Sequence, residues 1–167
     1  MNDRLAARAL LVIVLTVTGA RYAAGDLPGS SAPDFVLKSV SGENLRLSEY
    51  RGRVVMLSFW ASWCGECRSQ LEGLATLYER YGSAGFELLT VSLDRDRDQV
   101  ADIASAVKAG YPVLHDAAGE VGRSYEVSSM PLVVLIDRDG VVREVFEGYR
   151  RGHEERYLAR VRELLNE

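Results

Sequence analysis

A continuous apolar run passes directly into a helical pattern, and the only two cysteines of the chain stand at the junction. Residues 53–63 (RVVMLSFWASW) are β-branched, aliphatic and aromatic, as expected for a strand buried on both faces of a sheet. Residues 67–82 then predict a helix with one apolar face. The residues of that face are Leu71, Leu74, Leu77, Tyr78 and Tyr81. A central strand therefore leads into a helix, and Cys64 lies where one gives way to the other.

The position of this cysteine pair favours reactive chemistry. A helix N-terminus carries partial positive charge and free N–H groups, which stabilise the nucleophilic thiolate. The spacing places Cys67 one turn further on the same side, within reach of the sulfur of Cys64.

Other uses of the two cysteines are less favoured. A structural disulfide would close a very small loop with little entropic gain. Zinc usually needs four ligands, and His115 and His153 are isolated in the sequence. Haem attachment needs a histidine where Arg68 stands. A redox couple that exchanges disulfides is therefore the favoured interpretation.

Strand and helix patterns alternate along the rest of the chain. Strands are expected within 86–94 and 111–116, helices over 97–110, 118–127 and 151–167, and hairpins over 34–50 and 131–148. The second hairpin has the strong turn signal Asp139-Gly140. The alternation predicts an α/β layered fold with a mixed central sheet.

The first residues form a segment of their own. Arg4 and Arg8 precede an apolar run over 9–18, and small residues follow as far as Ala20, a pattern typical of a secretory signal peptide. The run is shorter than the roughly 20 residues of a transmembrane helix. Because Arg21 blurs the cleavage site, an uncleaved anchor stays open. Either interpretation places the protein outside the cytoplasm.

Composition restricts the remaining organisation. A chain of 167 residues with 47% hydrophobic content can build one core. The net charge is −4 and the charges are scattered, so no basic surface indicates a nucleic-acid partner. We expect a signal peptide or signal anchor over 1–24, a linker over 25–31 and a single domain over 32–167. Membrane association is expected only if the first segment stays as an anchor.

Three features together resemble the thioredoxin fold. They are the motif FWASWCGEC, the Met130-Pro131 step before an apolar strand, and the closing hairpin and helix. The match runs from about Ala32 to Leu165 and is closest to the exported TlpA/ResA-like thiol–disulfide oxidoreductases. The resemblance implies a mixed central sheet flanked by helices, an N-terminal β-hairpin, and a helix–strand insert over roughly 97–116.

The resemblance also implies site residues, each matched by position. Cys64 corresponds to the exposed nucleophile and Cys67 to the buried thiol that resolves the mixed disulfide, so the two form the redox disulfide. Trp63 corresponds to the aromatic residue that flanks the site. Pro131 corresponds to a cis-proline facing the cysteines, and Met130 would present its backbone to the substrate.

Several positions depart from the family pattern. Ser58 stands where thioredoxins carry a buried aspartate, so the nearest carboxylates by position are Glu66 and Asp94. Leu132 stands where the group usually has threonine. We expect Gly65, Glu66 and Asp94 to tune the redox properties, with Asp94 as a candidate base. A carboxylate at Glu66 opposes negative charge on the nucleophilic sulfur, which predicts a reductant.

Two other functions are weighed against this one. Peroxiredoxins share the fold but need a threonine and a proline where Ala61 and Leu57 stand, so peroxide reduction is disfavoured. A non-enzymatic binding module is the main alternative, with copper(I) held by the two thiolates and Met130 as the only further ligand candidate.

The resemblance implies partners as well. These are a disulfide-containing protein substrate, with apocytochrome c before haem attachment as the first candidate, and a membrane thiol transporter as the electron donor. It implies no cofactor and no metal. The expected location is the bacterial periplasm.

Overall fold

The structure is a computed structural model that describes residues 27–167. The signal peptide or anchor predicted over 1–24 lies outside the described residues. Within residues 27–167, no helix combines the length and the apolar character needed to cross a membrane.

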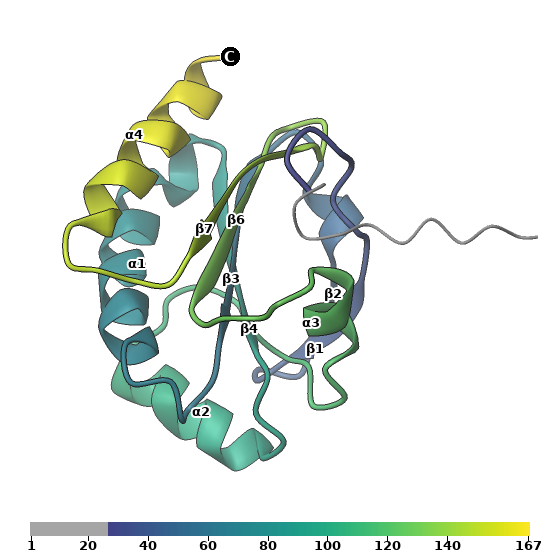
Figure 1. Cartoon of the computed structure of the whole chain (residues 1–167), viewed down its shortest axis with the longest axis vertical. Helices are drawn as coiled ribbons and strands as arrows, with labels where there is room; N and C mark the ends of the chain where they lie inside the picture. Colours follow the sequence, from purple (N-terminus) through teal and green to yellow (C-terminus); the bar gives the residue numbers. More distant parts are fainter. Residues whose placement is uncertain (1–26) are drawn as a thin grey trace, which may run out of the picture.

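A seven-stranded mixed sheet forms the centre of the molecule (Figure 1). The strands are β1 (Val36–Ser39), β2 (Asn44–Arg46), β3 (Val54–Trp60), β4 (Phe86–Ser92), β5 (Val113–His115), β6 (Leu132–Ile136) and β7 (Val142–Glu147). Their order in the sheet is β2-β1-β5-β4-β3-β6-β7. Strands β3, β4 and β5 run parallel, whereas every other neighbouring pair is antiparallel. The predicted mixed sheet, the N-terminal hairpin β1–β2 and the closing hairpin β6–β7 are confirmed.

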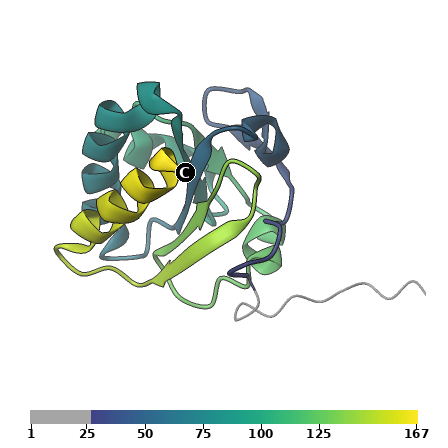
Figure 2. The same ribbon diagram turned by 90° about the horizontal axis from the view of Figure 1, so that it is seen from above.

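Helices cover the two faces unequally (Figures 1 and 2). Three long helices lie on one face: α1 (Cys67–Tyr81), α2 (Arg97–Ala106) and α4 (His153–Asn166). The other face carries α3 (Glu120–Ser124), the 3₁₀ turn η2 (Leu47–Tyr50) and the segment that begins at Leu27. Side chains alternate across β3, so that Val54 and Met56 join the core under the long helices while Val55 and Leu57 join the opposite core.

The two central strands determine where the site lies. All seven residues of β3 and all seven of β4 are buried, as predicted for strands covered on both faces. Their parallel register pairs Trp60 with Ser92, so both strands end at the same edge of the sheet. Strand β5 ends there too, since His115 pairs with Ser92. The helix–strand insert predicted over 97–116 is present as α2 and β5.

Several helix ends differ from the sequence prediction; α3, for example, covers Glu120–Ser124 and not 118–127. Helix α2 was expected to reach Gly110 but ends at Ala106, because Lys108 takes a left-handed conformation with φ 51°. The N–H groups of Lys108 and Ala109 donate to Ser105 and Ala104, which closes the helix.

Another difference is at the end of α1. The helix was expected over 67–82 but ends at Tyr81, and the chain continues into the 3₁₀ turn η3 (Gly82–Ala84). The left-handed glycine that ends this unit is therefore Gly85, with φ 89°, and not Gly82.

Part of the stretch expected as a linker packs on the domain. Leu27 is 1% exposed within the core that lies opposite the long helices. The N–H of Gly29 donates to the carbonyl of Val142, and Ser31 bridges to Val141. The packed part of the chain thus includes residues that precede Ala32.

Candidate active site

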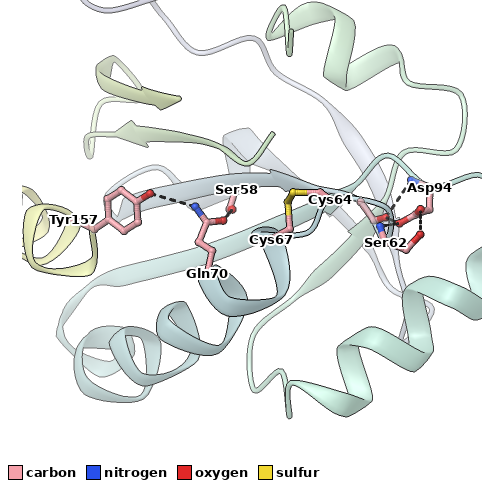
Figure 3. The surroundings of a disulfide bond; sticks show 8 residues. Ser58, Ser62, Cys64, Cys67, Gln70, Asp94 and Tyr157 are labelled. Atoms are coloured by element: carbon pink, nitrogen blue, oxygen red, sulfur yellow. Dashed lines mark hydrogen bonds between the residues drawn. A yellow bond between two sulfur atoms is a disulfide. The ribbon is translucent and has the colours of Figure 1, made fainter. Parts of the chain in front are cut away.

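A short turn joins β3 to α1; Cys64 lies in this turn, and Cys67 is the first residue of the helix (Figure 3). The N–H of Cys64 donates to the carbonyl of Ala61 at 3.1 Å, and the N–H of Cys67 donates to the carbonyl of Cys64 at 3.3 Å. Cys64 and Cys67 form a disulfide with their Cα atoms 5.4 Å apart. Cys67 is 1% exposed, whereas Cys64 is partly accessible. The two sulfurs therefore differ in their access to a partner protein.

Trp63 and the proline loop flank this turn. The Trp63 side chain is 71% exposed, which is unusual for so large an apolar group. The Met130-Pro131 peptide bond is cis, as the resemblance implied. Met130 and Cys64 both pack, partly buried, against the core under the long helices. Within residues 27–167 neither the N–H nor the carbonyl of Met130 is bonded to another backbone group.

The dipeptide between the cysteines faces solvent. Gly65 and Glu66 are both exposed, and a Cβ added at Gly65 would meet no atom within 4 Å. Glu66 is the N-cap residue of α1, and its side chain makes no capping hydrogen bond. The Glu66 carboxylate can therefore influence the cysteines electrostatically, through space and through water.

Asp94 follows β4 and contacts the turn before Cys64. The carboxylate is 4% exposed and accepts hydrogen bonds from the backbone and hydroxyl of Ser62 and from the hydroxyl of Ser92. Its bonds thus connect it to the turn residue Ser62. The predicted role of Asp94 as a base for Cys67 stays a prediction.

A buried polar chain lies on the other side of the disulfide in Figure 3. The hydroxyl of Ser58 donates to the side-chain oxygen of Gln70 at 3.1 Å, and the amide of Gln70 donates to the hydroxyl of Tyr157 at 3.2 Å. All three residues are 0% exposed. Burial raises the pKa of the Tyr157 hydroxyl, so this group stays protonated. The chain is thus neutral throughout.

Sequence reasoning missed Gln70 and gave Tyr157 only an apolar role. A signal for Gln70 was available, because it lies three residues after Cys67 and directly before Leu71, on the buried side of α1. Ser58 was noted as a departure from thioredoxins, but its partners could not be inferred, since Tyr157 is far away in the sequence. The polar group behind Cys67 is therefore an amide rather than a carboxylate.

Comparisons with known proteins give the family of the chain. The profile of the AhpC/TSA family matches residues 28–145. The thiol–disulfide oxidoreductase ResA of Geobacillus kaustophilus is 36% identical over 120 residues, which cover 72% of this chain and 69% of ResA. ResA of Bacillus subtilis is 32% identical over 120 residues, covering 72% of this chain and 67% of that protein.

A solved structure gives the same result. The crystal structure of a putative thiol:disulfide interchange protein DsbE from Chlorobium tepidum is similar with a TM-score of 0.79 and 35% identity. The similarity covers 83% of this chain and 97% of that protein. The thioredoxin fold is thereby confirmed, and the chain belongs to the AhpC/TSA family and, within it, to the ResA-like thiol–disulfide oxidoreductases.

Proposed function

We propose that the protein reduces disulfides of other exported proteins through the Cys64–Cys67 couple. The observation that carries this proposal is the unequal exposure of the two sulfurs at the start of α1. Because Cys64 is accessible, its sulfur can attack a substrate disulfide. Because Cys67 is buried, its sulfur can attack only the neighbouring sulfur of Cys64.

The reaction proceeds in two exchanges. The thiolate of reduced Cys64 attacks one sulfur of the substrate disulfide, which forms a mixed disulfide and releases one substrate thiolate. The thiolate of Cys67 then attacks the sulfur of Cys64. The second substrate thiolate leaves, and the Cys64–Cys67 disulfide remains. Two electrons have passed to the substrate, and a donor must restore both thiols.

Surfaces beside the disulfide support a protein substrate. The exposed Trp63 offers a large apolar contact next to Cys64. The backbone groups of Met130, which bond to no other backbone group within residues 27–167, can pair with an extended substrate segment, and Pro131 directly precedes β6. These roles are expected of Trp63, Met130 and Pro131 together.

Local charge supports the reducing direction. A couple is oxidising when its reduced form is stabilised, chiefly as the thiolate of the first cysteine. The exposed Glu66 places a negative charge between the two cysteines, and a thiolate on Cys64 would be opposed by it. Gly65 contributes no charge of its own. The dipeptide thus favours the disulfide form and a reductant.

Location and partners follow from the N-terminal pattern and the family. The basic start and short apolar run over 1–24 support export, with the bacterial periplasm as the compartment. In such an oxidising compartment a reductant needs a donor, for which a membrane thiol transporter is the candidate. Apocytochrome c before haem attachment is the candidate substrate.

Trapping of the mixed disulfide tests the proposal. With Cys67→Ser the second exchange is lost, so a stable mixed disulfide between Cys64 and a protein substrate should accumulate on a non-reducing gel. Cys64→Ser is the matched control and should trap nothing. Equal trapping by both variants, or by neither, would overturn the assignment. A parent protein that does not accelerate the reduction of insulin by dithiothreitol and binds copper(I) tightly would instead favour the binding module.

A further inference from the structure

Asp94 holds Ser62 with both of its carboxylate oxygens (Figure 3). The N–H of Ser62 donates to Oδ2 at 2.8 Å, and the hydroxyl of Ser62 donates to Oδ1 at 2.6 Å. Hydrogen bonds to an ionised carboxylate are shorter and stronger than those between neutral groups. Both the backbone and the side chain of Ser62 are therefore bonded to one buried carboxylate, and the hydroxyl also lies 3.3 Å from Oε1 of Gln99.

The sheet topology explains why these residues meet. Ser62 and Asp94 each lie two residues beyond the end of a strand, Ser62 after β3 and Asp94 after β4. The two strands are parallel neighbours with Trp60 opposite Ser92, so the segments that follow them leave the sheet side by side.

Asp94 is itself held from two directions. The hydroxyl of Ser92 donates to its Oδ2 at 2.8 Å and accepts from its N–H at 3.2 Å. Nε2 of His115 donates to its backbone carbonyl at 2.8 Å. Because a carbonyl only accepts, this nitrogen is the donor. His115 is the last residue of β5, the strand of the insert.

The residues held in this way directly precede the reactive ones. Trp63 and Cys64 follow Ser62, and Trp63 is too exposed for packing to fix its direction. The hydrogen bond from Cys64 to Ala61 shapes the turn internally. The two bonds from Ser62 to Asp94 tie the middle of that turn to the end of β4.

We propose that Ser62, Asp94 and His115 are positioning residues, which fix the direction in which Trp63 and Cys64 face a protein disulfide. This inference rests on the proposed function. It gives Asp94 a positioning role that does not depend on its acting as a base. It also gives the insert a task, because His115 on β5 supports the turn that carries the nucleophile.

Two pairs of variants separate positioning from charge. Ser62→Ala removes one hydrogen bond to the Asp94 carboxylate and leaves the carboxylate itself in place. Ser62→Thr keeps the hydroxyl, and the exposed position has room for the added methyl group. A hydrogen bond to a charged group corresponds to about a tenfold effect, so kcat/KM for insulin reduction should fall about tenfold in Ser62→Ala. Ser62→Thr should restore it. In the same way, His115→Phe should lower the rate and His115→Gln, which keeps a donor, should restore it.

The reaction of Cys64 with a small reagent distinguishes a loss of orientation from a general structural defect, because a general defect would change both reactions. Iodoacetamide needs no oriented Trp63, so its rate with reduced Cys64, followed across pH, should be the same in Ser62→Ala as in the parent. Ser69→Ala, which deletes an exposed hydroxyl on α1, is the matched control and should leave both rates unchanged.

The outcomes are distinct. A loss confined to insulin, with rescue by threonine and glutamine, supports positioning. Insulin reduction at the parental rate in Ser62→Ala and His115→Phe would overturn it. An equal loss with iodoacetamide and a displaced pH profile would also overturn it, because the effect would then be electrostatic. If the parent itself fails to reduce insulin, the proposed function fails first and the inference falls with it.

Discussion

Removing the hydroxyl of Tyr157 should destabilise the fold by a predictable amount. In Tyr157→Phe the ring keeps its edge-to-face contact with Phe146, so the main loss is the acceptor for the amide of Gln70. Gln70 is 0% exposed, and water cannot replace that acceptor. A buried donor left without a partner costs about 1–3 kcal/mol. For a domain of this size that corresponds to a fall of about 3–10 °C in Tm.

Urea unfolding of the disulfide-bonded protein measures this loss. Tyr81→Phe is the matched control: it deletes a hydroxyl that accepts a hydrogen bond from Arg162 at the exposed surface, where water can replace the bond, and the expected change is within about 0.5 kcal/mol. The combined variant Ser58→Ala, Gln70→Leu, Tyr157→Phe replaces the whole chain by apolar groups and should recover most of the lost stability. The reasoning is refuted if Tyr157→Phe unfolds like the parent, or if the combined variant is less stable than the single one.

Three further predictions concern charge and exposure. Equilibration with glutathione should show Glu66→Gln slightly more oxidising than the parent and Glu66→His clearly so; unchanged potentials would contradict the charge argument. Trp63→Ala should lower kcat/KM for insulin about tenfold or more while thermal unfolding stays the same, because the side chain is 71% exposed; equal activity would remove Trp63 from the substrate surface. Asp34→Asn should destabilise the protein at neutral pH. Burial raises the pKa of Asp34, but hydrogen bonds from Ser48 and Arg46 outweigh it and the net pKa is lowered from 3.8. Its stabilisation is therefore present above that value and is lost as pH falls through the folded pKa, so the difference in Tm should close in acid.

Much of the fold followed from local pattern. Strand β3 was predictable because its buried residues form an almost continuous apolar run, and β4 because its sequence is mostly aliphatic and aromatic. The hairpin β6–β7 was predictable because Asp139-Gly140 suits a tight turn. The end of α2 was missed because Lys108 takes the left-handed conformation, for which glycine is the usual signal. Gly110 was therefore predicted as the end of this helix.

Part of the site could be predicted before the structure. Cys64, Cys67 and Trp63 were predicted together because they form one motif, and the cis bond before Pro131 was predicted from the family resemblance. The hydrogen bonds of Ser62 to Asp94, by contrast, join segments separated by 32 residues, and no spacing rule connects them. His115 was considered only as a metal ligand, because its contact with Asp94 exists only once β5 pairs with β4.

The central claim is that Cys64 and Cys67 form a reducing couple, and its reduction potential is the most direct test. The protein is equilibrated with glutathione or dithiothreitol buffers, the thiols are alkylated, and the reduced fraction is read from the mass. We predict a potential more negative than about −200 mV, on the side of thioredoxin at about −270 mV. A potential less negative than about −200 mV, toward the roughly −120 mV of strong disulfide-forming catalysts, would contradict the account.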